Sequence, residues 1–371
     1  MGYAAMKGSL MVLIGILAVA LASAVAAAGT TGERVVPAVF VLGDSTLDVG
    51  NNNHLPGKGV PRANVPFYGI DFPGGPKATG RFSNGYNVAD FIAKNLGFER
   101  SPVAYLVLKS RNYLIPSALT RGVSYASAGA GILDSTNAGE NIPLSKQVHY
   151  FASTKTEMES AWGTRKVSAL LANSFFLLSI GSNDLFQSKP KTPADVVALY
   201  TNLVSNYSAA ITDLYGMGAR KFGIINMGPV GCVPRVRVLN ATGACNDGMN
   251  RMAVGFSSAV KSGLAALAPT LPGFAYSLAD SFAATNDVFA NPQSLGFVNA
   301  DNACCGVGRL GAEDGLCKRN STLCADRDAY MFWDAVHSTQ RAAELAAQQM
   351  FDGPFQITEP ISFKQLAQKK Y

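Results

Sequence analysis

Four short apolar runs recur along the chain, at residues 35–42, 175–180, 222–226 and 274–278, each bounded by Gly, Asn or Asp. They are rich in Val, Ile and Phe and do not alternate with polar residues, which is typical of strands buried on both faces. Apolar residues at three- and four-residue spacings predict helices between and after these runs, over residues 87–96, 193–215, 246–267 and 339–350. The second helix has Thr192 as a plausible N-cap and Pro193 in its first turn.

Strands that alternate with helices predict an α/β fold, a three-layer α/β/α sandwich with a mainly parallel central sheet. Ligands of such sheets bind at the carboxyl ends of the strands. Polar loops follow the first three predicted strands, at residues 43–45, 181–184 and 228–229, so we expect these loops to meet at one edge. No linker, low-complexity tract or repeat divides residues 29–371, and we expect them to form a single domain.

Residues 1–28 have the pattern of a secretory signal peptide. Lys7 is their only charge, an apolar core spans residues 10–22, and small residues at 24–28 form a cleavage site. A retained membrane anchor is the alternative, but no basic cluster follows, and no later segment approaches the roughly 20 apolar residues of a bilayer span. We therefore expect a secreted protein, extracellular or in the cell wall, with no stable membrane span after cleavage.

The cysteines and glycosylation sequons agree with that route. An even number of cysteines behind a signal peptide predicts disulfides, and the sequence leaves their pairing open, except that two adjacent cysteines are expected to take different partners. The spacing does not suit a metal site, because there is no C-x-x-C pair and no histidine among them. The sequons predict glycosylation at Asn206, Asn240 and Asn320. The six cysteines are Cys232, Cys245, Cys304, Cys305, Cys317 and Cys324.

The charge distribution does not indicate a polyanionic partner. The formal net charge is +6, but Lys and Arg are scattered and form no block. Scattered charges are typical of a solvated surface, so no nucleic acid partner is expected.

The candidate chemistry lies at two distant places in the chain. Ser45 follows the first apolar run in VFVLGDSTLDVGNNN, where Gly43 permits a tight turn and the residues after Ser45 can begin a helix. His337 is the only one of three histidines with a carboxylate, Asp334, at a spacing that orients an imidazole. Alone, the serine could be a helix cap and the histidine a core residue. Together they predict nucleophilic acyl transfer, because a serine hydroxyl needs a base and the base an orienting carboxylate.

Acyl transfer also needs hydrogen-bond donors for an oxyanion. Two glycine-rich loops can supply them. Residues 125–131 offer unhindered backbone amides, and residues 180–184 offer the side-chain amide of Asn183. The neighbouring Asp184 is expected to be a turn or capping residue rather than a catalytic acid.

With these segments in this order, the chain resembles the GDSL/SGNH hydrolase family, in particular its plant-type secreted esterase/lipase branch. The resemblance covers roughly residues 36–352 and implies the flavodoxin-like SGNH hydrolase fold. The chain departs from the usual pattern at Thr46 and Leu47, at Ser124 in place of Asn, and at Ala128 in place of Gly. The matching stretches are FVLGDSTLDVGNNN, RFSNG, SYASAGAGIL, IGSND, GPVGCVP, ACCG and FWDAVH.

The resemblance also implies roles for individual residues. Ser45 would be the nucleophile and, through its backbone amide, an oxyanion donor. Gly129 would add a second backbone amide and Asn183 a side-chain amide. His337, oriented by Asp334, would act as general base and then as general acid. All these groups belong to the protein, so no metal or organic cofactor is expected.

The predicted function is hydrolysis of carboxylic esters by a secreted serine esterase/lipase through an acyl-enzyme on Ser45. The resemblance allows acylated lipids, cutin-type polyesters, acetylated wall polysaccharides and small phenolic esters as substrates. One alternative is an acyltransferase, cutin-synthase-like or specific for phenolic esters, that uses the same triad. Another is a non-catalytic cell-wall binding protein, whose expected sign would be a missing Ser, Asn or His. The sequence does not indicate an oligomeric state.

Overall fold

The computed structural model describes residues 33–354 and 356–371, and the predicted signal peptide, residues 1–28, lies outside this range. Residues Arg34–Tyr371 form one compact unit. At its centre is a six-stranded sheet with the strand order β10-β5-β4-β3-β1-β2. All neighbouring strands are parallel except β10, which is antiparallel to β5. The strands are β1 Val39–Gly43, β2 Gly122–Ser124, β3 Phe175–Ser179, β4 Lys221–Ile225, β5 Ala275–Ala279 and β10 Thr358–Glu359.

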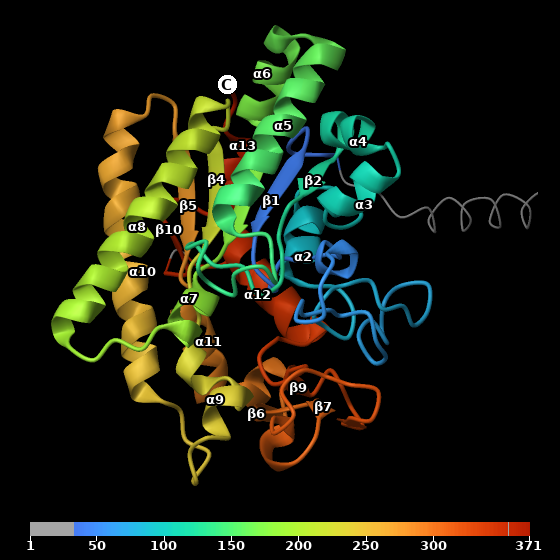
Figure 1. The fold of residues 1–371 in the computed structure, drawn as a ribbon, viewed down its shortest axis with the longest axis vertical. Helices are drawn as coiled ribbons and strands as arrows, with labels where there is room; N and C mark the ends of the chain where they lie inside the picture. Colours follow the sequence, from blue (N-terminus) through green and yellow to red (C-terminus); the bar gives the residue numbers. More distant parts are fainter. Residues whose placement is uncertain (1–32, 355) are drawn as a thin grey trace, which may run out of the picture. The chain divides into compact units, whose positions relative to one another are not determined.

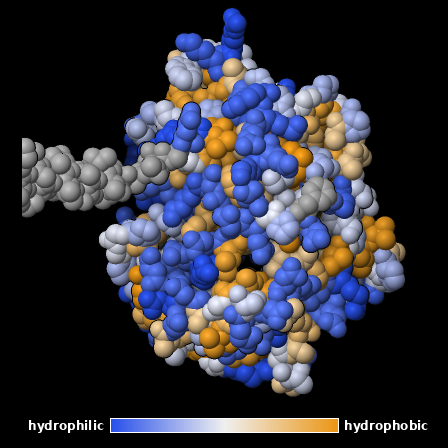
Figure 2. Space-filling view, turned by 180° about the vertical axis from the view of Figure 1, so that it is seen from behind, coloured by the Kyte–Doolittle hydropathy of each residue, from blue (hydrophilic) through white to orange (hydrophobic). Residues whose placement is uncertain are grey.

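Helices cover both faces of this sheet, which confirms the predicted α/β/α sandwich (Figure 1). The alternation along β1 divides the core: Phe40 and Leu42 pack with one group of helices, and Val39 and Val41 pack with the other. On the face shown in Figure 2, hydrophilic residues predominate and the apolar residues between them form small areas. The first group is α3 Tyr105–Ser110, α4 Leu114–Thr120, α5 Leu144–Trp162, α6 Thr164–Asn173, α8 Pro193–Gly216 and α10 Asp247–Leu267, and the second is α2 Val88–Asn95, α12 Gln340–Asp352 and α13 Phe363–Gln368.

The four strands and four helices predicted from the apolar pattern are present as β1, β3, β4 and β5 and as α2, α8, α10 and α12. The largest difference is at β1, which begins at Val39 and not at residue 35, because Pro37 has no amide to donate to a neighbouring strand. Thr192 caps α8 as expected, by accepting a hydrogen bond from the amide of Asp195. Among the described residues, no helix is both long and apolar enough to cross a bilayer.

A small lobe, residues 299–332, lies beside the main sheet. It contains two short pairings, β6 Asn299–Ala303 with β9 Tyr330–Phe332 and β7 Cys305–Gly306 with β8 Thr322–Leu323. Figure 1 places β6, β7 and β9 together at the lower end of the view. We call residues 299–332 the disulfide lobe. The disulfides are Cys304–Cys324 and Cys305–Cys317 within the lobe and Cys232–Cys245 outside it, so the adjacent cysteines do take different partners.

A buried lysine joins the sheet to the last helix. Lys221 on β4 is fully buried, and its Nζ donates a hydrogen bond of 2.8 Å to the carbonyl oxygen of Ala367 near the end of α13. Helix ends carry carbonyls without helical partners, so this bond satisfies one of them. Burial, with a smaller contribution from Lys370, lowers the pKa of Lys221 to about 8.

We expect the stability of the chain relative to Lys221→Met to depend on pH. The pKa of Lys221 is lower in the folded chain than its ordinary value of 10.5, so unfolding takes up a proton between these two values. The free energy of unfolding of the wild type therefore rises with pH from about 8 to about 10, and that of Lys221→Met lacks this rise. Denaturant titrations at several pH values measure the free energy of unfolding of both proteins. Lys166→Met, an exposed position on α6, is the control, and parallel pH curves for wild type and Lys221→Met would contradict the interpretation.

Candidate active site

Ser45 lies in a turn directly after β1, half-buried at the carboxyl end of the sheet. The amides of Leu47 and Asp48 donate to the carbonyl oxygen of Asp44, at 3.2 and 3.0 Å. The helix that the residues after Ser45 could begin is not formed, and a turn stands there instead. The Asp48 carboxylate accepts hydrogen bonds from the amides of Gly50 and Asn51, at 2.7 and 2.8 Å, and these bonds turn the backbone away from a helical path.

The end of β1 is held from the side by a glutamine of α5. Gln147 is fully buried, and its Oε1 accepts from the amide of Gly43 while its Nε2 donates to the carbonyl of the same residue, both at 2.8 Å. Gly43 is required here because a Cβ atom would collide with the carbonyl oxygen of Ser179. The backbone just before Ser45 therefore has one defined path.

Asp48 connects the Ser45 turn to the glycine-rich loop at residues 125–131. Besides the amides of its own turn, its carboxylate accepts a bond of 3.1 Å from the amide of Ala128. The carbonyl of Ala128 accepts from Nδ2 of Asn52, at 2.8 Å. Complete burial raises the pKa of Asp48 to about 6, although these backbone hydrogen bonds oppose the rise. The replacement of the usual Gly by Ala at 128 leaves both backbone groups of this residue hydrogen-bonded.

Gly129 follows with a positive φ of 82°, a conformation that favours glycine. Its carbonyl oxygen accepts a bond of 2.7 Å from Asn137 Nδ2. Its amide, like that of Ser45, has no hydrogen-bond acceptor within residues 33–354 and 356–371. The other departure from the family pattern, Ser124, has a buried hydroxyl without a partner among the same residues.

Asn183 and Asp184 are on α7 Ser182–Gln187, which follows β3. Asn183 Nδ2 donates a bond of 2.9 Å to the carbonyl of Ala130, which engages one of its two N–H groups. The Asp184 carboxylate accepts from the amide of Ile132 at 2.9 Å and from the Thr136 hydroxyl at 2.7 Å. Asp184 thus fixes the glycine-rich loop against α7, which is a structural role but differs from the turn or capping role expected for it.

His337 and Asp334 form a buried pair after β9. His337 Nδ1 lies 2.8 Å and 2.9 Å from the two carboxylate oxygens of Asp334, and Asp334 is inaccessible to solvent. The carboxylate also accepts from the amides of Val336 and His337, both at 2.9 Å, and from the hydroxyl of Tyr68, at 2.7 Å. Burial alone would raise the pKa of Asp334, but the attraction of His337 and these hydrogen bonds bring it below its ordinary value.

Tyr68 and Phe82 are functional candidates that the sequence reasoning missed. Phe82 belongs to the RFSNG stretch, and its ring centroid lies 4.8 Å from that of His337. The RFSNG motif could have pointed to Phe82 as a residue of the site. Nothing in the sequence pairs Tyr68 with an aspartate 266 residues away. Both side chains are almost completely buried, at 2% exposure for Tyr68 and 3% for Phe82.

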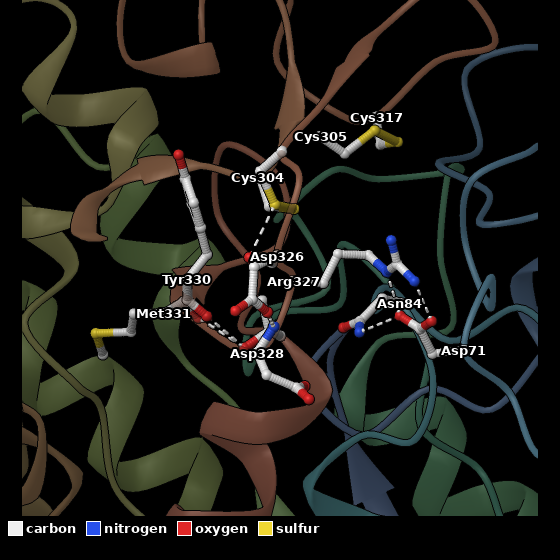
Figure 3. Close-up of a disulfide and its surroundings, with 12 residues drawn as sticks. Asp71, Asn84, Cys304, Cys305, Cys317, Asp326, Arg327, Asp328, Tyr330 and Met331 are labelled. Atoms are coloured by element: carbon white, nitrogen blue, oxygen red, sulfur yellow. Dashed lines mark hydrogen bonds and ion pairs between the residues drawn. A yellow bond between two sulfur atoms is a disulfide. The ribbon is translucent and has the colours of Figure 1, made fainter. Parts of the chain in front are cut away.

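The segment that carries these two aromatic residues is tied to the disulfide lobe. Asp71 receives two bonds of 2.6 Å from the Arg327 guanidinium and one of 2.8 Å from Asn84 Nδ2 (Figure 3). Asn84 in turn accepts from the amide of Gln340 at the start of α12, at 2.7 Å. Phe82 is therefore anchored both to the lobe and to the helix that follows His337.

Ser45, Asn183 and His337 line two adjoining cavities of about 200 and 210 Å³. Gly228 and Pro229 line the first cavity, so the three loops expected at one edge do meet there. Gly129 lines the second cavity. Among the described residues, no three His, Cys, Asp or Glu side chains are grouped so as to hold a metal ion. The chemistry available at this edge is that of a hydroxyl, an imidazole–carboxylate pair and amide donors.

Residues 39–350 match the family model described as GDSL-like Lipase/Acylhydrolase. The match covers most of the chain, which therefore belongs to this family. This membership confirms the predicted class of enzyme, a hydrolase that acts on carboxylic esters.

Several curated relatives support the same assignment. The Arabidopsis thaliana protein GDSL esterase/lipase At1g71691 is 35% identical over 346 residues, which cover 91% of this chain and 87% of the relative. GDSL esterase/lipase At1g71250, from the same plant, is 36% identical over 350 residues, which cover 91% and 90%. GDSL esterase/lipase APG is 34% identical over 335 residues, which cover 87% and 92%. The similarity thus extends over nearly the whole length of each protein.

We expect Tyr68→Phe to destabilise the chain in a pH-dependent way. The variant removes a hydrogen bond to a buried carboxylate, which costs about 1–3 kcal/mol when the carboxylate is ionised. The pKa of Asp334 is lowered in the folded chain, so this contribution is present above the ordinary carboxyl pKa and is lost as the pH falls through the folded value. The difference in unfolding free energy between wild type and Tyr68→Phe should therefore shrink below about pH 4.

Denaturant titrations at a series of pH values test this expectation. Tyr105→Phe is the matched control, because Tyr105 is equally buried but its hydroxyl accepts from Lys109 and contacts no carboxylate. A loss of stability that is the same at every pH would mean that the Tyr68 hydroxyl contributes only packing.

Proposed function

We propose that the chain hydrolyses carboxylic esters through an acyl-enzyme on Ser45. The observation that carries the proposal is that Ser45, Asn183 and the Asp334-bound His337 line one cavity although they come from three distant segments. A hydroxyl, a base with an orienting carboxylate and an amide donor are what acyl transfer by a serine requires.

In the first half of the reaction, Ser45 Oγ attacks the carbonyl carbon of the ester. His337 Nε2 takes the hydroxyl proton, while Nδ1 keeps its hydrogen bond to Asp334. The negative charge on the carbonyl oxygen is held by the amides of Ser45 and Gly129 and by the second N–H of Asn183. The carbon–oxygen bond to the alcohol then breaks, and His337 donates its proton to the departing oxygen.

In the second half, a water molecule attacks the acyl-enzyme. His337 removes a proton from the water, the same donors hold the second oxyanion, and the bond between the acyl carbon and Ser45 Oγ breaks. The proton on His337 returns to Ser45 Oγ and the carboxylic acid leaves. An alcohol in place of water would give a new ester by the same steps, so product analysis distinguishes hydrolysis from transfer, and we propose net hydrolysis.

We also propose that the chain follows the secretory route and is glycosylated. Asn206 on α8, Asn240 and Asn320 are all exposed, so each sequon is accessible to modification. The disulfides are of the kind that persist in oxidising compartments.

We expect Ser45→Ala to abolish ester hydrolysis and leave the fold intact. Loss of a triad nucleophile typically lowers kcat by about 10⁴-fold or more. His337→Ala should behave in the same way, and the double variant should be little worse than either single one, because the two residues act as a unit. Initial rates on a small ester, with unfolding curves as the control for folding, measure this. Turnover by Ser45→Ala at the wild-type rate would reject the mechanism.

We expect Asn183→Ala to lower kcat by roughly 10²- to 10³-fold with a much smaller change in KM. A side-chain oxyanion donor binds most strongly to charge that develops in the transition state. Asn183 also donates to the carbonyl of Ala130, so unfolding curves must accompany the kinetics. If KM alone increased, Asn183 would bind the ground state and its oxyanion role would be withdrawn.

A further inference from the structure

The two cavities at the candidate active site differ in chemistry. They share a junction, where the reacting carbonyl group of an ester would lie, and they extend from it in separate directions. We call the first cavity the apolar arm and the second the polar arm. The junction is formed by Ser45, Phe82, Asn183, Phe186, Val336 and His337.

Beyond the junction, the lining of the apolar arm includes the apolar side chains of Val230, Val233, Met331 and Phe332, together with polar side chains such as those of Ser182 and Thr285. The four apolar side chains are exposed by less than 10%, so they offer buried apolar surface to a bound molecule. The arm has a volume of about 200 Å³. An apolar cavity of about 150 Å³ binds benzene, so this arm has room for an aromatic ring or a short to medium aliphatic chain.

The polar arm contains two side chains of opposite charge, Glu140 and Arg235, together with Asn137. Both charged side chains are exposed, and neither forms an ion pair with another residue in the described part of the chain. The backbone of Arg235 is nevertheless fixed, because its amide donates 2.8 Å to the carbonyl of Ala335. The Glu140 carboxylate occupies the space that a Cβ atom on Gly59 would need. This arm thus presents a donor and an acceptor to a bound molecule.

We propose that the apolar arm holds the acyl part of the ester and the polar arm holds an uncharged alcohol with several hydroxyl groups. The inference rests on the proposed function, since it takes the junction as the place of reaction. An acyl chain gains free energy by leaving water for apolar surface, and the four buried apolar side chains are in the apolar arm. The alcohol must leave and water must enter before the acyl-enzyme is resolved, and the exposed side chains of Glu140 and Arg235 place solvent at the polar arm.

The opposite charges of the polar arm give no net preference for a charged alcohol. A phosphorylated alcohol would be attracted by Arg235 but repelled by Glu140, and a cationic one would meet the reverse. A polyhydroxy alcohol can donate to the carboxylate and accept from the guanidinium, and charge-assisted bonds of this kind are the stronger ones. Acylated sugars and acylglycerols share this chemistry, and the experiment separates them.

The acyl side is tested with p-nitrophenyl esters from acetyl to dodecanoyl. For the wild type, kcat/KM should rise about fourfold for each methylene that enters the apolar arm and level off once the arm is full. Val233→Phe should lower the ratio of kcat/KM for hexanoyl to that for acetyl by about tenfold, because it shortens the arm. Val230→Phe fills the same arm from a neighbouring position and replaces Val233→Phe if that variant does not fold.

The alcohol side is tested with the hexanoyl group held constant and the alcohol varied among ethanol, glycerol, glucose and glycerol phosphate. Arg235→Met and Glu140→Gln should each lower the preference for the glycerol and glucose esters over the ethyl ester by about tenfold, the usual effect of losing one charge-assisted hydrogen bond. Arg165→Met, on exposed α6, controls for the change in net charge and should leave every ratio unchanged. For the wild type, the ratio of kcat/KM for the glucose ester to kcat/KM for the glycerol ester shows whether the preferred alcohol is a sugar or glycerol.

Three results would overturn the inference: preference for the phosphate ester, loss of chain-length selectivity in Arg235→Met, or loss of alcohol selectivity in Val233→Phe. Each would mean that the arms are assigned wrongly. Hydrolysis of the acetyl ester distinguishes a wrong assignment of the arms from a wrong proposal for the reaction. If Ser45→Ala hydrolyses it as fast as the wild type, the acyl-enzyme proposal fails. If hydrolysis depends on Ser45 but the selectivity ratios do not change as expected, only the assignment of the arms fails.

Discussion

Buried carboxylates that accept backbone amides hold the catalytic edge together. An ionised carboxylate without partners is costly inside a protein, so the segments that donate to it have little freedom to separate. Asp48 joins the Ser45 turn to the loop of Gly129, and Asp184 joins that loop to the helix of Asn183. Asp334 does the same for His337 and Tyr68. In the proposed mechanism, the position of each reacting group thus depends on a neighbouring buried acid that does no chemistry on the substrate itself.

The residues that fix the reacting groups in place are thus different from the residues that would select the substrate. The carboxylates of Asp48, Asp184 and Asp334 bond to the backbone and line neither cavity, whereas the side chains of the two arms line the cavities. Phe82 belongs to both sets of residues, because it packs on His337 and also lines both arms. Its segment is fixed through Asp71 to Arg327, so the disulfide lobe contributes to the site without supplying a reacting group.

The sequence predicted the elements whose signal is local and missed contacts that depend on folding. The apolar runs and the cap at Thr192 are short-range patterns, and the strands and helices they indicate are present. A helix does not form after Ser45, because the Asp48 side chain accepts hydrogen bonds from the amides of Gly50 and Asn51, which a helix would have used. The Tyr68–Asp334 bond and the division into two arms have no local signal, since they join residues hundreds of positions apart or depend on which side chains face a cavity.

One short stretch of backbone supplies both arms. Val233 lines the apolar arm and Arg235 lines the polar arm, and between them is only Pro234, at the start of α9 Pro234–Arg237. The Cys232–Cys245 disulfide and the amide bond of Arg235 to Ala335 anchor this stretch. A change in the path of this short stretch would therefore alter the lining of both arms at once, so the two selectivities proposed for them are coupled through one piece of backbone.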